Sequence, residues 1–146
     1  MNSTPLVSIV IPVHNQLQFT QQCLASIESN TEPGSYEVIV VNDASTDGTE
    51  EFLQLWRGSK PWFHSITNSE NLGFARSCNQ GADWATSKYL LFLNNDTAVT
   101  PGWLLPLVET LENNLDIGIV APKLVFPDGT IQHCGKVWGE WQLPRS

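Results

Sequence analysis

The chain has 146 residues, of which 41% are hydrophobic, and its formal net charge is −8 at pH 7. This composition indicates a globular domain with a substantial core and excludes a disordered chain. The negative charge argues against a nucleic-acid partner, because neutralising a phosphate backbone requires positive charge.

Targeting signals and cysteine motifs are both missing from the sequence. No apolar stretch reaches the ~18 residues of a transmembrane segment, and no basic region followed by an apolar region starts the chain. The cysteines Cys23, Cys78 and Cys134 are widely spaced and form no CxxC pair. We therefore expect free, buried thiols in a reducing cytosol rather than a zinc site or a disulfide framework.

Strand and helix patterns alternate through the first two thirds of the chain. In order, the predicted elements are a strand at 7–13, a helix at 17–29, a strand at 36–41, a helix from 49 to about 57, a strand at 63–67, a helix at 74–86 and a strand at 89–93. We predict that Thr49 caps its helix and that Leu55 faces inward. The strand at 89–93 has no polar alternation, which predicts burial on both faces.

The last third has a different pattern. Thr100 and Pro101 predict the start of a helix, with Pro106 as a kink or a delay. A short strand is predicted at 117–121 and a hairpin at 123–126 and 130–133. Trp138 and Trp141 follow with few elements left to cover them, which is typical of an interface.

The alternation of strands and helices predicts one α/β domain over residues 1–146, with a mostly parallel sheet and helices on both faces. Polar loops begin at Pro12, Asn42 and Asn94, each at the end of a predicted strand. Parallel strands bring such loops to one edge of the sheet, where ligands bind in folds of this class.

Two carboxylates and one guanidinium at that edge could bind a divalent cation and a nucleotide. Asp96 follows a strand and suits a hard divalent cation, although Asn-Asn-Asp-Thr is also ordinary turn chemistry. Asp43 is placed to bind a base or a ribose and Arg76 to bind a nucleotide; the alternatives are an Asx-turn for Asp43 and a surface ion pair for Arg76. The sequence contains no GxGxxG and no GxxxxGK[ST], which argues against a nicotinamide dehydrogenase and a P-loop ATPase.

Four segments resemble the nucleotide-binding half of the family 2 glycosyltransferases, which have the GT-A fold. They are VSIVIPVHN at 7–15, residues 37–49 ending in VNDASTDGT, NLGFARSCN at 71–79 and YLLFLNNDT at 89–97. The stretch at 121–133, with APKL and PDGTIQH, is similar to a rhamnosyltransferase-like branch of that family. The resemblance implies a Rossmann-like fold that binds a nucleotide diphosphate sugar.

The resemblance also implies roles for individual residues. It places Pro12, His14, Asn15, Asn71 and Gly73 at the nucleotide pocket, where the family often has an aromatic residue at the position of His14. It implies that Asp43 contacts the base, usually uracil or thymine, and that Arg76 lies near the base or the diphosphate.

The family's DxD motif corresponds to Asn94, Asn95 and Asp96 in this chain. Because Asn94 replaces the first carboxylate, the resemblance implies that Asp96 is the direct ligand of Mg²⁺ or Mn²⁺. Because the motif then carries one negative charge fewer, we expect it to bind the cation more weakly.

The implied reaction is sugar transfer from the nucleotide donor to a hydroxyl of a glycan or lipid-linked acceptor, with an inverting outcome expected. The family places the catalytic base downstream, which for this chain means beyond Ser146. The implied whole is therefore a longer enzyme in polysaccharide or cell-surface glycan synthesis. We expect it in the cytoplasm, with peripheral association at the inner face of the membrane as an alternative.

Two other functions stay open. A sugar nucleotidyltransferase shares related chemistry but normally carries a Gly-rich, basic N-terminal loop, and residues 12–15 have neither Gly nor Lys. The other alternative is a catalytically silent nucleotide-binding or interaction module.

Overall fold

A computed structural model describes residues 4–135 of the chain, which divides into two units, Met1–Trp103 and Leu104–Ser146. The first unit contains a four-stranded sheet of β1 (Val7–Val13), β2 (Tyr36–Asn42), β3 (Phe63–Thr67) and β4 (Tyr89–Phe92). The strand order is β3-β2-β1-β4, and every pairing is parallel. The predicted parallel α/β architecture is confirmed.

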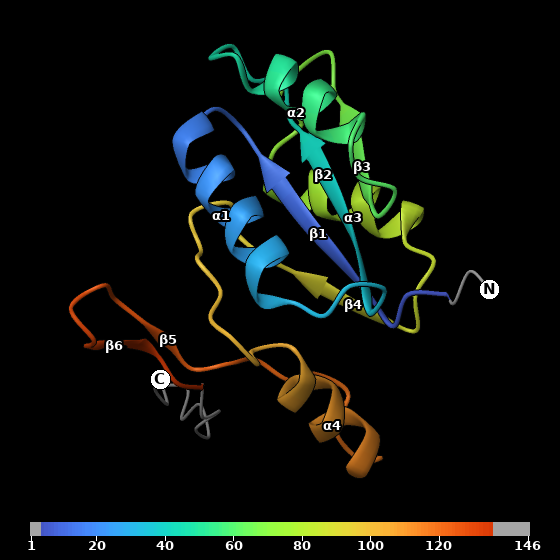
Figure 1. Ribbon diagram of the computed structural model, residues 1–146, viewed down its shortest axis with the longest axis vertical. Coiled ribbons are helices and arrows are strands. Elements are labelled where there is room, and N and C mark those ends of the chain that lie inside the picture. Colours follow the sequence, from blue (N-terminus) through green and yellow to red (C-terminus); the bar gives the residue numbers. More distant parts are fainter. Residues whose placement is uncertain (1–3, 136–146) are drawn as a thin grey trace, which may run out of the picture. The chain divides into compact units, whose positions relative to one another are not determined.

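Three helices connect these strands: α1 (Leu17–Asn30), α2 (Thr49–Arg57) and α3 (Phe74–Trp84). Figure 1 shows α1 in front of the sheet and α3 behind it, so both faces carry a helix, as predicted. The central strands β1 and β2 are almost completely buried, because each is apolar and lies between these layers. No helix within residues 4–135 is long and apolar enough to cross a lipid bilayer.

Gly81 allows α3 to lie directly on the sheet. A Cβ atom built at this position would come 2.4 Å from Val10 Cγ1 and 3.2 Å from Val41 Cγ2. Real side chains do not approach so closely, so the helix position depends on the missing side chain. This explains why a residue with poor helix propensity occupies the interior of α3.

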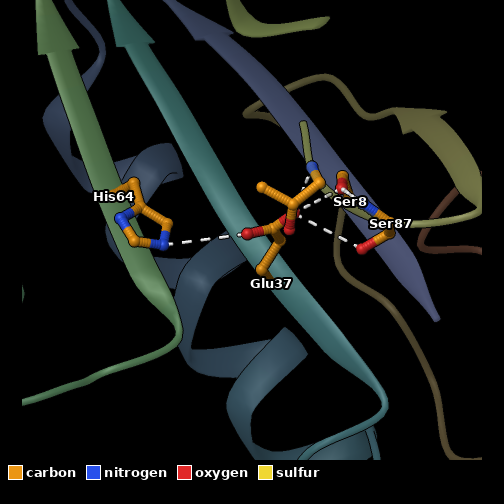
Figure 2. A network of polar contacts seen from close by, with 5 residues as sticks. Ser8, Glu37, His64 and Ser87 are labelled. Atoms are coloured by element: carbon orange, nitrogen blue, oxygen red, sulfur yellow. Dashed lines mark hydrogen bonds and ion pairs between the residues drawn. The ribbon is translucent and has the colours of Figure 1, made fainter. Parts of the chain in front are cut away.

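Glu37 on β2 ties the exit of α3 to the sheet at its amino edge. Its Oε1 accepts hydrogen bonds from Ser8 Oγ at 2.6 Å and from both the backbone N and Oγ1 of Thr86 at 2.9 Å. Figure 2 shows this network, in which Ser87 also donates to Oε1 and His64 Nε2 lies 3.8 Å from Oε2. Burial alone would raise the pKa of Glu37, but the hydrogen bonds from Ser8 and Thr86 outweigh it and hold the pKa below its usual value.

The fourth strand differs from its prediction. Burial on both faces is wrong for β4, because Leu90 and Phe92 are 43% and 50% exposed. Among the described residues β4 pairs only with β1, so it is an edge strand. An apolar run without alternation therefore does not show whether a strand is central or at an edge.

The second helix also differs in detail. Leu55 is 78% exposed, so its predicted inward position is wrong, and Leu53 is the buried residue instead. Thr49 is the first residue of α2 rather than its cap; Gly48 precedes it with φ of 83°. At this position glycine supplies the left-handed turn that reverses the chain into the helix.

The second unit contains α4 (Leu105–Asn113) and an antiparallel hairpin of β5 (Leu124–Val125) and β6 (Ile131–His133). The hairpin prediction is confirmed. The predicted strand at 117–121 is wrong, because these residues pair with no described strand. The helix begins at Leu105, so the predicted start at Thr100 and Pro101 is wrong and the alternative of a delay is confirmed. Pro106 lies in the first turn of α4, where a backbone N–H has no partner within the helix, so the proline causes no kink.

The three cysteines within 4–135 are free, and two are buried as predicted, but Cys134 is exposed. The predicted exposed tryptophans, Trp138 and Trp141, lie outside the described residues.

The contact at Gly81 leads to a stability prediction. Gly81→Ala should lower the free energy of unfolding by about 1–3 kcal/mol, because overpacking against Val10 outweighs the gain in helix propensity. Gly58→Ala is the matched control, since φ there is −64° and the new Cβ would make only an ordinary 3.6 Å contact. Urea unfolding of both variants measures the difference; equal stability of the two would show that the close approach is unimportant.

Candidate functional site

The carboxyl edge of the sheet gathers three loops that the sequence singles out. His14 and Asn15 follow β1, Asp43 follows β2, and residues 94–96 follow β4. Because β1 lies between β2 and β4, the second and third loops leave the sheet roughly 10 Å apart, two strand spacings. The chain passes from β1 to β2 on one side while β4 lies on the other, and ligands bind at such a switch in strand order.

Asp43 is buried and holds the loop that leads into α3. Its Oδ1 accepts hydrogen bonds from Asn68 Nδ2 and the backbone N of Leu72, both at 2.9 Å, and its Oδ2 accepts one from the backbone N of Gly73 at 2.8 Å. The carboxylate thus neutralises free N–H groups at the start of α3, where the helix dipole also favours negative charge. Burial opposes ionisation, yet these hydrogen bonds prevail and hold the pKa of Asp43 below its ordinary value.

His14 is fixed by its ring to the loop after β2. Its Nδ1 lies 2.6 Å from the backbone O of Asp43, so Nδ1 carries the proton and donates it to that carbonyl. Asn15 Nδ2 lies 3.3 Å from His14 Nε2, which accepts a hydrogen bond from it. Together the two contacts orient an exposed ring at the end of β1.

The loops after β1 and β2 are joined by further polar contacts. Asn15 accepts a hydrogen bond from the backbone N of Thr46 at 2.7 Å and donates its own backbone N–H to Ser45 Oγ at 2.7 Å. Asn15, Gln16 and Ala44 have φ between 56° and 64°, a conformation that costs energy for residues other than glycine. Strained backbone of this kind is concentrated at functional sites, and here it lies on the predicted edge.

Asp47 was not predicted to join the two loops, and it does so through both oxygens. Its Oδ2 accepts a hydrogen bond from the backbone N of Leu17 at 2.9 Å, and its Oδ1 accepts one from Thr49 Oγ1 at 2.6 Å. One carboxylate therefore accepts hydrogen bonds from the first residues of both α1 and α2. Asp47 Oδ1 also accepts a hydrogen bond from the backbone N of Thr49 at 3.3 Å, and the contact with Leu17 has no signal in the sequence.

Asn71, Gly73 and Arg76 approach the edge from the start of α3. Gly73 has φ of 85° and precedes the helix directly, and Asn71 Oδ1 accepts its N–H at 3.0 Å. Arg76 lies on the first turn of α3, is exposed, and forms no ion pair with any residue in 4–135. Pro12 is half-buried in β1 beside Val41, whereas Asp43 is the most enclosed of the predicted residues.

The turn after β4 is attached to α1. Asn95 Nδ2 donates to Thr20 Oγ1 at 3.1 Å, and Cys23 Sγ donates to the backbone O of Asn94 at 3.7 Å. Burial raises the pKa of the Cys23 thiol to about 12, with a further contribution from the charge of Asp96, so that thiol stays protonated. Asp96 itself is exposed.

The donor set of this turn fits one side of a divalent-cation site. Asp96 offers a carboxylate and its neighbours Asn94 and Asn95 offer carboxamide oxygens, which are the ligand types that Mg²⁺ and Mn²⁺ accept. No group of three or more His, Cys, Asp or Glu residues within 4–135 forms a complete metal site. Residues 94–96 would therefore share the cation with ligand oxygens and water.

Comparison with known proteins assigns the chain to a family. Residues 8–142 match the family model described as glycosyl transferase family 2. The chain belongs to this family. O-antigen biosynthesis protein RfbC of Myxococcus xanthus is 33% identical over 153 residues, covering 99% of this chain and 12% of that protein. Glycosyltransferase AglE of Haloferax volcanii is 32% identical over 132 residues, covering 88% and 43%.

Solved structures agree with the GT-A fold. TarS 1-349 of S. aureus in complex with UDP-GlcNAc has a TM-score of 0.67 at 23% identity, covering 74% of this chain and 31% of that one. Mannosyltransferase PcManGT from Pyrobaculum calidifontis, in complex with GDP-Man and Mn²⁺, has a TM-score of 0.58 at 27% identity, covering 64% and 28%. The chain spans less than half of the length of both curated relatives, RfbC and AglE.

The contacts of Asp43 predict a pH-dependent loss of stability. Asp43→Asn should lower the free energy of unfolding at pH 7 by about 2–4 kcal/mol, because an amide cannot accept all of the hydrogen bonds that the buried carboxylate accepts. Since the folded pKa lies below the unfolded one, the contribution of Asp43 is complete above the unfolded pKa of about 4 and declines as the pH falls through the folded pKa.

Urea unfolding between pH 3 and pH 7 measures this effect. The difference between wild type and Asp43→Asn should shrink toward the acid end. Asp128→Asn is the matched control, because Asp128 accepts its bonds within an exposed hairpin turn. A difference that stays constant over this pH range would show that the charge of Asp43 does not support the fold.

Proposed function

We propose that the carboxyl edge of this sheet binds a nucleoside diphosphate sugar, and that the chain forms the donor-binding part of a glycosyltransferase. The observation that carries the proposal is the convergence of three loops at the switch in strand order, with a cation-binding donor set on one of them. Membership of glycosyl transferase family 2 supports it, as do the relatives named for O-antigen and teichuronic acid biosynthesis.

The base and ribose would lie beside the loops after β1 and β2. Pro12, His14 and Asn15 present a half-buried surface and an oriented imidazole there. The bonds that Asp43 makes to Leu72 and Gly73 use part of its acceptor capacity, and a carboxylate has about four lone-pair sites in all. We infer that Asp43 first shapes the pocket wall and offers the base only its remaining capacity.

The diphosphate would lie between α3 and the turn after β4. Arg76 has a guanidinium that no described acidic residue neutralises, which suits it to phosphate oxygens. A chain with a net charge of −8 repels an anionic donor, so local positive charge is needed at this point. Asp96, with Asn94 and Asn95, would hold Mg²⁺ or Mn²⁺, which supplies Lewis-acid stabilisation to the departing diphosphate when bound.

The proposed reaction exchanges one bond for another at the anomeric carbon of the sugar. The bond from that carbon to the diphosphate oxygen breaks, and a bond to the acceptor oxygen forms. The acceptor hydroxyl loses its proton to a base, and we assign no residue of this chain to that role. The sugar, the acceptor and the similarity of 121–133 to a rhamnosyltransferase-like branch stay predictions.

Calorimetry of the 146-residue chain with UDP, GDP and dTDP, with and without MnCl₂, tests the donor site. At least one nucleotide should bind tighter with Mn²⁺, and Asp96→Asn should remove most of that gain, about tenfold or more in Kd, because it removes the carboxylate ligand. Binding without Mn²⁺ should change little, and Asp128→Asn serves as the control variant.

Failure to bind any of the three nucleotides would contradict the proposal and favour a role as an interaction module. Mn²⁺-dependent binding that Asp96→Asn leaves intact would contradict the assignment of the cation to the turn after β4. Metal-dependent binding followed by turnover of the matching nucleotide sugar would exclude a catalytically silent nucleotide-binding module.

A further inference from the structure

One face of α1 carries polar side chains that contact the segment after β4 at two places. Thr20, Cys23, Ser26 and Asn30 are spaced by three, three and four residues, which places them on one side of a helix. The first pair contacts residues 94 and 95, and the second pair contacts Val99.

The first place of contact lies immediately before Asp96. Thr20 is completely buried, and its Oγ1 accepts a hydrogen bond from Asn95 Nδ2 at 3.1 Å. Cys23 contacts the backbone O of Asn94 at 3.7 Å. The amide nitrogen of Asn95 and the backbone carbonyl of Asn94 therefore both contact α1.

The second place of contact lies three residues after Asp96. Ser26 Oγ accepts the backbone N–H of Val99 at 3.0 Å, and Asn30 Nδ2 donates to the backbone O of Val99 at 3.0 Å. Both backbone groups of one residue are thus held by the same helix. Val99 itself is buried, which fixes this place further.

Between the two anchors the chain has little freedom. A turn hydrogen bond from the backbone N of Thr97 to the backbone O of Asn94, at 3.2 Å, closes the intervening residues on themselves. The backbone of Asp96 is consequently restrained on both sides while its carboxylate remains exposed. A ligand residue of this kind is pre-organised, so cation binding has less conformational entropy to remove.

We propose that Thr20, supported by Cys23, Ser26 and Asn30, is a positioning residue that orients the turn of Asp96 for a divalent cation shared with a nucleoside diphosphate. This inference rests on the proposed function, because it needs Asp96 to be a cation ligand. Thr20 does not touch the cation; it acts through Asn95. Residues one step behind metal ligands typically change metal affinity by about 10–100-fold when their hydrogen bond is lost.

Two buried threonines, Thr20 within α1 and Thr31 at its C-cap, allow a matched test of the positioning role. Thr20→Val removes the acceptor for Asn95, and Thr31→Val makes the same chemical change at the buried C-cap, where Thr31 Oγ1 accepts a hydrogen bond from Trp103 Nε1 at 3.0 Å. Thr31→Val loses this one hydrogen bond, while Thr20→Val also loses the 3.5 Å hydrogen bond from Thr20 Oγ1 to the backbone O of Gln16, so both variants should lose stability. Only Thr20→Val should change the geometry of the Asp96 turn.

The measurement is the apparent Kd of Mn²⁺, from titration with MnCl₂ at saturating UDP or GDP, beside the Kd of the same nucleotide without metal. Thr20→Val should weaken Mn²⁺ binding about tenfold and leave the metal-free nucleotide affinity unchanged. Thr20→Ser, which keeps the hydroxyl, should restore the affinity, and Thr31→Val should match wild type. Ser26→Ala, at a half-buried position, removes a hydrogen bond from the second place of contact, at Val99, and should also weaken Mn²⁺ binding. This variant provides the test if Thr20→Val does not fold.

Failure of this inference and failure of the proposed function give different results. Wild-type Mn²⁺ affinity in Thr20→Val, or an equal loss in Thr31→Val, overturns the positioning role alone. Absence of Mn²⁺-dependent nucleotide binding in the wild-type chain overturns the donor site and the positioning role together.

Discussion

Parallel pairing of β1 with both of its neighbours is the constraint on which the site depends. Because β2 and β4 run in the same direction on either side of β1, their carboxyl ends lie at one edge of the sheet. The loops of Asp43 and Asp96, which are far apart in the sequence, therefore leave this edge only about two strand spacings apart. The pairing itself is stabilised by burial of the apolar strands between α1 and α3. Polar side chains that would be costly inside the sheet are thereby collected where they remain accessible to a ligand.

Two buried carboxylates complete this frame, Glu37 on β2 and Asp43 immediately after it. Glu37 and Asp43 are six residues apart, so they point to the same face of the sheet, toward α3. Asp43 holds the residues that lead into α3, and Glu37 holds the residues that leave it. Their lowered pKa values have one cause in common, since hydrogen bonds to the ionised form outweigh the cost of burial in each. The helix that carries Arg76 is thus held at both ends, by a residue of β2 and by the residue that follows this strand.

Much of this architecture could be predicted from the sequence because its signals are local. The β-branched strands, the polar loops at their ends and the Pro-Asp-Gly turn at 127–129 each carry their own pattern, and the structure confirms the elements they predict. The edge position of β4 and the exposure of Leu55 could not be predicted, because both depend on which other elements pack nearby. The contacts of Asp47 with Leu17 and of Cys23 with Asn94 join residues 30 and 71 positions apart, and a single sequence holds no record of such pairs. The roles of Asp43, Arg76 and Asp96 toward a ligand remain predictions.

Because Glu37 and Asp43 hold the two ends of α3, they limit where residues can be inserted into this chain or deleted from it. Side chains alternate between the two faces of a strand, so inserting or deleting one residue between these positions would turn one carboxylate away from α3 and into the α1 layer. A change of two residues would keep the face but alter the span by about 7 Å, more than a turn of helix. The spacing between Glu37 and Asp43 therefore sets the positions at which the two ends of α3 are held. Insertions are tolerated in the surface loops instead.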